Sequence, residues 1–385
     1  MNPLARTPRS ARILPGLLLA LPVLALAVIG SGSASAVGSP SRSPHDQRPH
    51  VRPDHDRGGH DRADIVVAAD GSGDTTTVQG AVDLAPAGSS ARTTILIRPG
   101  VYQGAVTVGA DKTGLTFVGA TGDPEDVVIT DDRANGTPKE GGGTWGTSGS
   151  ATVTVAGAGF EARGVTFANA FDEAAHPEIA NRQAVAVKTM ADKVVFDHVR
   201  FLGNQDTLYL DSPAADVPAR VYVRDSYVEG DVDFIFGRAT AVIEGSTIKA
   251  LRRDSTPDGY VFAPSTSKEF AHGFLVTRSR LITDADPGAY ALARPWHPSS
   301  APDNDPRLVV RDSYLAAHLA VDAPWATMSG YDWTPGSNAE YRNSGPGALV
   351  TDARPQLDAR TARAYEVADF LRGDDGWSPQ DGPRC

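Results

Sequence analysis

One short pattern recurs along this sequence and restricts its fold more than any other feature. Six segments of alternating polar and apolar residues can be aligned between residues 160 and 315. Alternation with a period of two is typical of β-strands, and Gly, Asn or Asp commonly follows each segment, as in turns. The aligned positions, which are 34, 27, 20, 33 and 34 residues apart, are Val165, Val199, Ser226, Ser246, Ser279 and Ser313.

Repeats of this length, with short strands and no helical stripe, indicate a solenoid in which successive turns of the chain stack. A leucine-rich repeat is the alternative, but its fixed Leu and Asn pattern is absent. We therefore predict an all-β fold, a right-handed parallel β-helix of roughly ten coils over residues 63–350. One amphipathic helix is expected at Val78–Leu84, capping the first coil, and a second at Ala359–Arg372, packing along the barrel near its end.

Residues 1–36 have the organisation of a secretory signal peptide. Three arginines precede a 17-residue apolar stretch, which leads to a small-residue cleavage pattern at residues 34–36. A transmembrane anchor is the alternative, but two prolines and a glycine interrupt this short stretch. The sequence therefore predicts an exported, extracellular protein that is not held in a membrane after cleavage.

Residues 37–62 are rich in Ser, Pro, Asp, Arg and His and are expected to be a disordered linker. A histidine recurs there every five residues, so metal binding is the alternative, but Pro and Gly interrupt the tract. The folded, catalytic domain is expected over residues 63–385. Cys385 is the only cysteine, so no disulfide can form within the chain. We also expect a monomer.

The charge of the chain argues against nucleic acid or an anionic membrane as a partner. Three of the 36 basic residues and none of the 47 acidic residues lie in residues 1–36, so residues 37–385 carry a net charge of −14. Nucleic acid and anionic membranes are disfavoured as partners of a protein with this charge.

Two carboxylates occupy the same place in successive repeats. Asp206 follows Val199 by seven residues, and Asp233 follows Ser226 by seven residues. Because equivalent positions of adjacent coils stack about 4.8 Å apart, the two side chains are expected side by side. A structural ladder of like residues is the alternative, but like charges at this distance repel in a poorly hydrated site. The spacing favours a catalytic pair, in which one acid is neutral and the other is ionised.

Two amides, an arginine and a tryptophan complete the expected site. Gln183 and Gln205 are able to stabilise a developing oxyanion, although either alone would be an ordinary surface amide. Arg294 is expected to pair with one aspartate and keep it ionised as a nucleophile. Trp296 offers a flat face to a sugar ring, with plain core packing as the alternative.

Several ordered motifs give the chain a resemblance to the pectinesterases, also called pectin methylesterases, which are carbohydrate esterases built on a parallel β-helix. The motifs extend over nearly all of residues 64–350 and follow the order of the family. They are DIVVAADGSGDTTTVQGAVDLAP (64–86), RPGVY (98–102), SATVTVAGAGF (150–160), QAVAV (183–187), QDTLY (205–209), DFIFG (233–237), ARPW (293–296) and EYRNSGPGA (340–348).

The resemblance implies a role for each matching residue. Asp233 resembles the nucleophile of the family, and Asp206 resembles its general acid and base. Gln183 and Gln205 match the oxyanion-hole amides, and Arg294 matches the arginine that hydrogen-bonds the nucleophile. Positions that line the substrate cleft of the family are matched by Thr152, Tyr209, Phe236, Trp296 and, less closely, Met328. The sequence departs from the family pattern at three positions, Gly104, Asn204 and Ala293, none of which is a reacting group.

The resemblance also implies a reaction, hydrolysis of the methyl ester at C6 of galacturonate units in pectin, with no metal or organic cofactor. The residues fit an acyl-enzyme route in which Asp233 attacks and Asp206 protonates methanol. A pectate lyase or a polygalacturonase on the same solenoid remains the nearest alternative. A non-catalytic polysaccharide-binding β-helix and an esterase for another acyl ester are the others.

Overall fold

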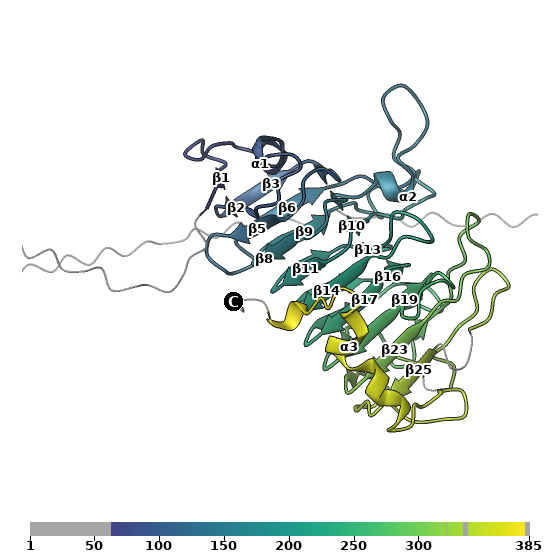
Figure 1. The fold of residues 1–385 in the computed structure, drawn as a ribbon. Coiled ribbons are helices and arrows are strands. Elements are labelled where there is room, and N and C mark those ends of the chain that lie inside the picture. The colour runs from purple at the N-terminus through teal and green to yellow at the C-terminus, as the bar shows by residue number, and fades with distance from the viewer. Residues whose placement is uncertain (1–62, 321, 334–337, 382–385) are drawn as a thin grey trace, which may run out of the picture. The chain divides into compact units, whose positions relative to one another are not determined.

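The computed structural model describes residues 63–320, 322–333 and 338–381. The expected signal peptide and linker, and Cys385, lie outside the described residues. In the described part, short strands form three parallel sheets that wind into a parallel β-helix (Figure 1). The predicted fold class is therefore confirmed.

Each coil of the β-helix contributes up to one strand to each sheet. The ten-stranded sheet contains, in spatial order, β1 (Ile65–Val67), β2 (Thr93–Ile97), β5 (Leu115–Gly119), β8 (Glu161–Arg163), β11 (Val194–Asp197), β14 (Arg220–Arg224), β17 (Thr240–Glu244), β20 (Phe274–Thr277), β23 (Leu308–Arg311) and β25 (Asn338–Tyr341). The eight-stranded sheet contains β3 (Gly100–Gln103), β6 (Val127–Asp131), β9 (Thr166–Asn169), β12 (Arg200–Leu202), β15 (Tyr227–Gly230), β18 (Thr247–Ala250), β21 (Arg280–Thr283) and β24 (Tyr314–Leu315).

The seven-stranded sheet carries the candidate site described below. It contains β4 (Val106–Val108), β7 (Val153–Val155), β10 (Val187–Thr189), β13 (Leu208–Leu210), β16 (Val232–Gly237), β19 (Gly259–Pro264) and β22 (Tyr290–Ala293). Inside the coils, aromatic and branched side chains stack from turn to turn. Phe160 contacts both Phe117 and Phe196, with ring centroids 5.0 and 6.1 Å apart. The core is thus continuous along the solenoid, as its repeats require.

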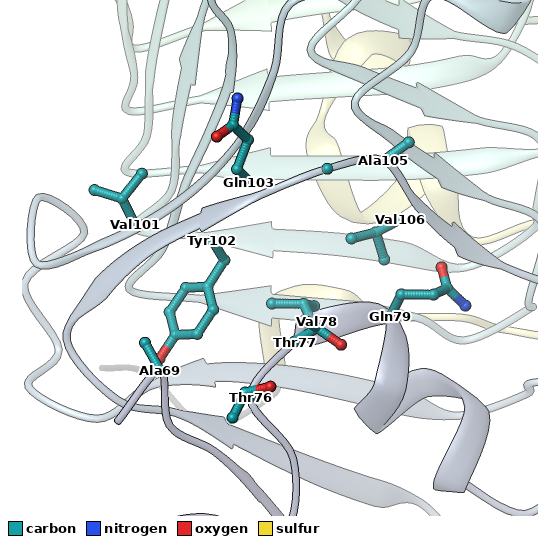
Figure 2. A pocket seen from close by; sticks show the side chains of 11 residues that line it. Ala69, Thr76, Thr77, Val78, Gln79, Val101, Tyr102, Gln103, Ala105 and Val106 are labelled. Carbon is teal, nitrogen blue, oxygen red and sulfur yellow. The ribbon is translucent and has the colours of Figure 1, made fainter. Parts of the chain in front are cut away.

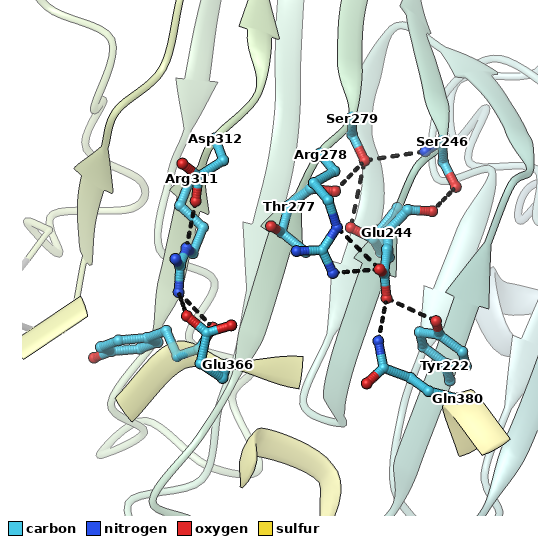
Figure 3. Close-up of polar contacts among 12 residues, drawn as sticks. Tyr222, Glu244, Ser246, Thr277, Arg278, Ser279, Arg311, Asp312, Glu366 and Gln380 are labelled. Atoms are coloured by element: carbon cyan, nitrogen blue, oxygen red, sulfur yellow. Dashed lines mark hydrogen bonds and ion pairs between the residues drawn. The ribbon is translucent and has the colours of Figure 1, made fainter. Parts of the chain in front are cut away.

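The aligned positions of the repeat mark the turn between the ten-stranded and eight-stranded sheets. The residue before each serine has a positive φ, which lets the chain turn from one sheet into the next within two residues. Each serine hydroxyl then accepts a hydrogen bond from the preceding coil: Val199 N–H donates to Ser226 Oγ, and Ser226 N–H donates to Ser246 Oγ, both at 3.1 Å. Ser246 N–H continues the ladder to Ser279 Oγ (Figure 3). The repeated serine therefore satisfies a backbone donor that the sheets leave unpaired.

The first predicted helix is confirmed. It forms α1 (Val78–Leu84), whose first turn is capped by the Thr77 hydroxyl, which accepts a hydrogen bond from Gly80 N–H at 3.1 Å. Its apolar face, including Val78 and Val82, packs on the first coils and closes this end of the core.

The second predicted helix is wrong as a single element. Residues 361–371 form a 3-10 helix (Thr361–Tyr365) and a separate α3 (Val367–Leu371), because Glu366 between them is extended. Arg311 of β23 explains the break, since its Nη1 donates to the carbonyls of Ala362 and Tyr365, both at 2.9 Å. A tertiary hydrogen bond thus uses the Ala362 carbonyl that a continuous helix would pair with Glu366 N–H.

The C-terminal segment packs across the outer face of the ten-stranded sheet (Figure 1). Phe370 and Leu371 of α3 cover outward side chains of β14, β17, β20 and β23. A second 3-10 helix (Pro379–Asp381) follows, in which Gln380 Nε2 donates to Glu244 Oε2 at 3.0 Å (Figure 3). Tyr222 Oη donates to the same oxygen at 2.7 Å. The segment is therefore fixed by both apolar and polar contacts.

No helix within the described residues has both the length and the apolar character needed to cross a membrane.

Candidate active site

The candidate site is a cavity of about 540 Å³ on the outer face of the seven-stranded sheet. Its floor comes from β13 and β16, and one wall comes from a short helix, α2 (Gly146–Gly149), with Trp145 before it. The lining residues are Trp145, Gly146, Thr147, Ser148, Gln183, Gln205, Asp206, Tyr209, Asp233, Phe236, Ala263, Arg294, Trp296 and Met328.

Two aspartates line this cavity from adjacent coils. Leu208 of β13 is paired with Ile235 of β16, so the same register places Asp206 beside Asp233. The backbone confirms this proximity, because Asp206 N–H donates to the Val232 carbonyl at 3.0 Å. Both aspartates have positive φ angles, 70° and 49°, a conformation that Asp adopts more readily than most residues but at some cost.

Arg294 distinguishes the two carboxylates. It follows β22, and its Nε and Nη2 donate to the two oxygens of Asp233 at 2.7 and 2.5 Å. The guanidinium also lies over the ring of Tyr260, 3.8 Å from the ring centroid. Ala293, where glycine is usual in the family pattern, does not prevent this reach. The arginine therefore holds Asp233 in a bidentate ion pair, an arrangement that favours the charged carboxylate.

The surroundings of the two aspartates affect their pKa values differently. Only 7% of Asp206 and 6% of Asp233 is exposed. Burial, followed by the negative charge of Asp233, raises the pKa of Asp206 well above its usual value. Burial also raises the pKa of Asp233, but the hydrogen bonds and charge of Arg294 oppose this rise. A proton shared by the pair therefore resides on Asp206, and Asp233 is the ionised member.

Two amides lie beside the acid pair. Gln205 directly precedes Asp206, and the Gln205 carbonyl accepts a hydrogen bond from Ala184 N–H at 3.0 Å, which places Gln183 on the neighbouring coil. Both side chains line the cavity. The Oε1 atom of Gln183 is buried and has no hydrogen-bond partner among the described residues. An unpaired buried amide oxygen is costly in a folded protein and is consistent with a group that pairs when a ligand binds.

Aromatic side chains form the apolar part of the floor. The rings of Tyr209 and Phe236 stack with centroids 4.2 Å apart and an interplanar angle of 17°. Trp296 meets both rings edge-on, at 5.9 and 5.5 Å. Such a platform presents flat apolar surface beside polar reacting groups, which suits the faces of sugar rings.

Comparison with known proteins places this geometry in a family. The model of the Pectinesterase family matches residues 64–374. A pectinesterase of Ralstonia solanacearum is 35% identical over 321 residues, which cover 74% of this chain and 80% of that protein. The chain belongs to the pectinesterase family.

Solved pectinesterase structures share the fold. A pectin methylesterase in complex with a hexasaccharide has a TM-score of 0.73 and 31% identity, covering 82% of this chain and 98% of that chain. The pectin methylesterase from Erwinia chrysanthemi has a TM-score of 0.72 and 31% identity, with the same coverage. This pectinesterase therefore shares the β-helix as well as the sequence pattern of its relatives.

The structure brings nine of the ten predicted site residues into one cavity. The exception is Thr152, whose side chain is fully buried and whose hydroxyl donates to the Ala168 carbonyl at 2.8 Å. Direct contact between the Thr152 side chain and a ligand is thus not supported. The resemblance implied that Thr152 lines the substrate cleft, whereas its hydroxyl is used inside the β-helix.

Sequence reasoning missed the wall formed by Trp145 and α2. A usable signal was present, because a lone tryptophan in a glycine-rich stretch suggests an exposed aromatic residue on a loop. In the structure the Trp145 ring lies under the guanidinium of Arg133, with 4.2 Å between Arg133 Cζ and the ring centroid. Ala263 of β19 was also missed, since a small residue carries no chemical signal.

A second cavity of about 230 Å³ lies at the N-terminal end of the same sheet (Figure 2). None of its lining residues is charged, and the Tyr102 hydroxyl is already used as a donor to the Arg98 carbonyl at 2.8 Å. Gly104 lines this cavity with a φ of 114°, a conformation that glycine adopts far more readily than the glutamate usual in the family pattern. The departure at Gly104 thus fits the local backbone.

No group of three or more His, Cys, Asp or Glu side chains able to hold a metal ion occurs within residues 63–320, 322–333 and 338–381. The expectation that the reaction needs no metal or organic cofactor stays a prediction.

Proposed function

We propose that this member of the pectinesterase family hydrolyses the methyl esters of galacturonate units in pectin, releasing methanol and leaving pectate. The acid pair carries the proposal, because two buried carboxylates from adjacent coils are differentiated by one arginine. A related pectin methylesterase has been solved with a hexasaccharide, which supports a polysaccharide substrate for the cavity described here. Secretion and a monomeric state remain predictions from the sequence.

In the proposed mechanism, the ionised Asp233 attacks the ester carbonyl carbon. The resulting oxyanion is stabilised by the side-chain amides of Gln183 and Gln205, which lie beside the pair. Asp206 donates its proton to the departing methoxide oxygen, so methanol leaves and an acyl-enzyme anhydride remains on Asp233. The bidentate contacts of Arg294 keep Asp233 charged and fix the direction of its attack.

The second half of the reaction restores the enzyme. Asp206, now ionised, accepts a proton from water, and the hydroxide attacks the acyl carbon. The bond to Asp233 breaks, the galacturonic acid unit leaves and loses its proton to solvent, and Asp206 is again neutral while Asp233 is again ionised. The two steps require opposite protonation states of Asp206, which its raised pKa makes accessible.

The Asp233→Asn variant tests the role of the nucleophile. We expect methanol release from methylated pectin to fall by about 10⁴-fold or more, because an amide cannot form the acyl-enzyme. The circular dichroism spectrum and the melting temperature should show a folded protein. Rapid-quench mass spectrometry of the wild-type protein should detect an acyl adduct on the peptide that contains Asp233.

A matched control uses an aspartate outside the cavity. Asp83 in α1 is exposed, and its side chain accepts a hydrogen bond from Gln79 Nε2 at 2.8 Å, a contact that asparagine can retain. Asp83→Asn should keep wild-type activity. Wild-type turnover by Asp233→Asn would refute the proposed nucleophile. Loss of pectin viscosity without methanol release by the wild-type protein would refute the esterase assignment in favour of chain cleavage.

A further inference from the structure

The segment that carries Gln183 has no regular structure of its own. Residues 170–186, all of which the structure describes, contain no helix or strand, and β10 begins only at Val187. The proposed mechanism nevertheless requires the amide of Gln183 to be held within about 0.5 Å of its working position. Reacting groups on loops are held less precisely than those on strands, so contacts from another part of the molecule must fix this segment.

One buried side chain makes these contacts. Asn169 is the last residue of β9 and is only 4% exposed (Figure 1). Its Nδ2 donates to three backbone carbonyls, those of Arg133 at 2.9 Å, Ser150 at 3.1 Å and Val185 at 3.1 Å. Its Oδ1 accepts a hydrogen bond from Phe171 N–H at 3.0 Å. Because an amide nitrogen has two hydrogens, one of them is shared between two carbonyls, and the whole amide is used.

The contacts of Asn169 converge on the backbone two residues after Gln183. The Val185 carbonyl accepts from Asn169, and Val185 N–H donates to Ser150 Oγ at 3.2 Å. Because Asn169 also binds the Ser150 carbonyl, both polar backbone groups of Val185 belong to one closed set of hydrogen bonds. The Gln183 carbonyl accepts from Asn135 N–H at 2.7 Å, and Asn135 is two residues after another carbonyl that Asn169 binds.

This amide links segments that no strand register brings together. It joins the end of β9, both ends of the insertion between β6 and β7, and the segment of Gln183. A leucine of similar size would fill the same space, but it would leave three carbonyls without this donor. The chemistry of the amide, rather than its volume, is therefore what holds the segment.

We propose that Asn169 is a positioning residue for Gln183, and that it fixes the irregular segment so that the amide of Gln183 is directed at the oxyanion beside Asp233. This inference rests on the proposed function and adds a residue to it. Asn169 is not among the residues that line the cavity, so it acts only through the backbone that it holds. A preorganised donor acts in the transition state, so misplacing it should lower kcat rather than the affinity for substrate.

The test replaces the amide by an apolar group of similar size, in Asn169→Leu, and measures methanol release from methylated pectin. We expect kcat to fall about 10²-fold, as for a reacting group misplaced by about 1 Å, while KM changes by less than about threefold. Both limbs of the pH profile of kcat/KM should stay where they are in the wild-type protein, because the hydrogen bonds of Asn169 reach neither Asp206 nor Asp233. A general disruption of the cavity would instead raise KM or move a limb, and either result would overturn the inference.

A double-mutant cycle shows whether Asn169 acts through Gln183. Gln183→Ala alone should lower kcat by about 10²–10³-fold, as for the loss of one oxyanion donor. In that background Asn169→Leu should cost about threefold or less, because the amide that it positions is already absent. Two losses that simply multiply would overturn the inference, as would a wild-type kcat in Asn169→Leu.

A second variant decides the question if Asn169→Leu does not fold. Ser150→Ala removes the hydroxyl that accepts from Val185 N–H and donates to the Thr147 carbonyl at 2.7 Å, and it leaves the Asn169 side chain intact. We expect kcat to fall about fivefold, as for one lost hydrogen bond, with KM unchanged. The same loss in the Gln183→Ala background would overturn the inference.

A matched control uses another buried asparagine. Asn338 of β25 is 3% exposed and lies outside the cavity, and its Nδ2 donates to the Pro306 carbonyl at 3.1 Å. Asn338→Leu should lower the melting temperature and keep the wild-type kcat; a 10²-fold loss of kcat there would overturn the inference, because any buried asparagine would then have the same effect. If the wild-type protein releases no methanol, the proposed function itself fails. If the wild-type protein and Gln183→Ala behave as expected but Asn169→Leu does not, only the present inference fails.

Discussion

Replacing Arg294 by glutamine removes the ion pair that distinguishes Asp233 from Asp206. Arg294 donates two hydrogen bonds to Asp233, at 2.7 and 2.5 Å, and its side chain is only 19% exposed. Glutamine is shorter and neutral, so neither contact is replaced in kind. We expect Arg294→Gln to fold, because Asp233 can accept a proton instead of remaining as an unpaired buried charge.

The size of the effect follows from the lost contacts. Each hydrogen bond to a charged group contributes about 1.5–3 kcal/mol, so the two contacts favour ionised Asp233 by about 3–6 kcal/mol. At 1.4 kcal/mol per factor of ten, the ionised fraction of Asp233 should fall by about 10²–10⁴ where protonation is limiting. Burial already raises the pKa of Asp233, and the hydrogen bonds and charge of Arg294 that oppose this rise are lost in the variant.

The measurement is the pH dependence of kcat/KM for methanol release. Because the reaction needs ionised Asp233, the acidic limb of the profile should move to higher pH in Arg294→Gln, and part of the activity should return on the alkaline side. Arg294→Lys keeps the charge but loses the bidentate geometry, so its acidic limb should lie between those of the wild-type and glutamine proteins. A uniform loss of rate at every pH, with the acidic limb unmoved, would show that Arg294 only positions Asp233 and would refute the reasoning.

Three further predictions follow from buried groups. Burial raises the pKa of Asp231 to about 6, and the negative charge of Asp231 helps to raise the pKa of Asp206. Asp231→Asn should therefore lower the pKa of Asp206 and move the alkaline limb of the kcat/KM profile to lower pH. His318 is buried without a hydrogen-bond partner among the described residues, and burial lowers its pKa from 6.5 to about 4. Folding therefore favours the neutral form of His318, and about 3 kcal/mol of stability, fully present above pH 6.5, is lost as the pH falls toward 4. In denaturant titrations, the free energy of unfolding should fall less between pH 7.5 and pH 4.5 for His318→Leu than for the wild-type protein. Finally, a Cβ at Gly237 would lie 2.0 Å from the Leu210 carbonyl oxygen, whereas a Cβ at Gly104 would meet nothing within 4 Å. Because both glycines have a positive φ, the difference between the two alanine variants isolates the clash, and Gly237→Ala should lower the free energy of unfolding by about 2–3 kcal/mol more than Gly104→Ala. Equal free energies of unfolding would contradict the clash.

The repeat made the fold and the acid pair predictable. In parallel coils the register is preserved from strand to strand, so a spacing of 27 residues that equals the coil length places Asp206 beside Asp233. The aligned serines lie at equivalent turns, as the repeat requires, but the sequence did not predict that their hydroxyls form a hydrogen-bonded ladder. Predictions of this kind hold wherever a residue lies at a repeated position.

Predictions failed where the chain leaves the repeat. α2 belongs to an insertion between β6 and β7, so no register placed it against the floor. Thr152 directly precedes β7, where the alternation of the strand does not fix the direction of a side chain. The C-terminal helix has the expected apolar face, but hydrogen bonds from Arg311 interrupt it. Each of these outcomes depends on contacts between segments distant in the sequence, which local patterns do not contain.

The repeat alone, however, would not produce a catalytic pair. Stacking two coils places two chemically equal carboxylates in one low-dielectric site, and equal acids would share a proton without a fixed assignment. Arg294 breaks this equivalence because it follows β22, two strands beyond β16, and its hydrogen bonds reach only the nearer acid, Asp233. The repeated coils therefore bring the two carboxylates together, and Arg294, which is not part of the repeat, makes them chemically different.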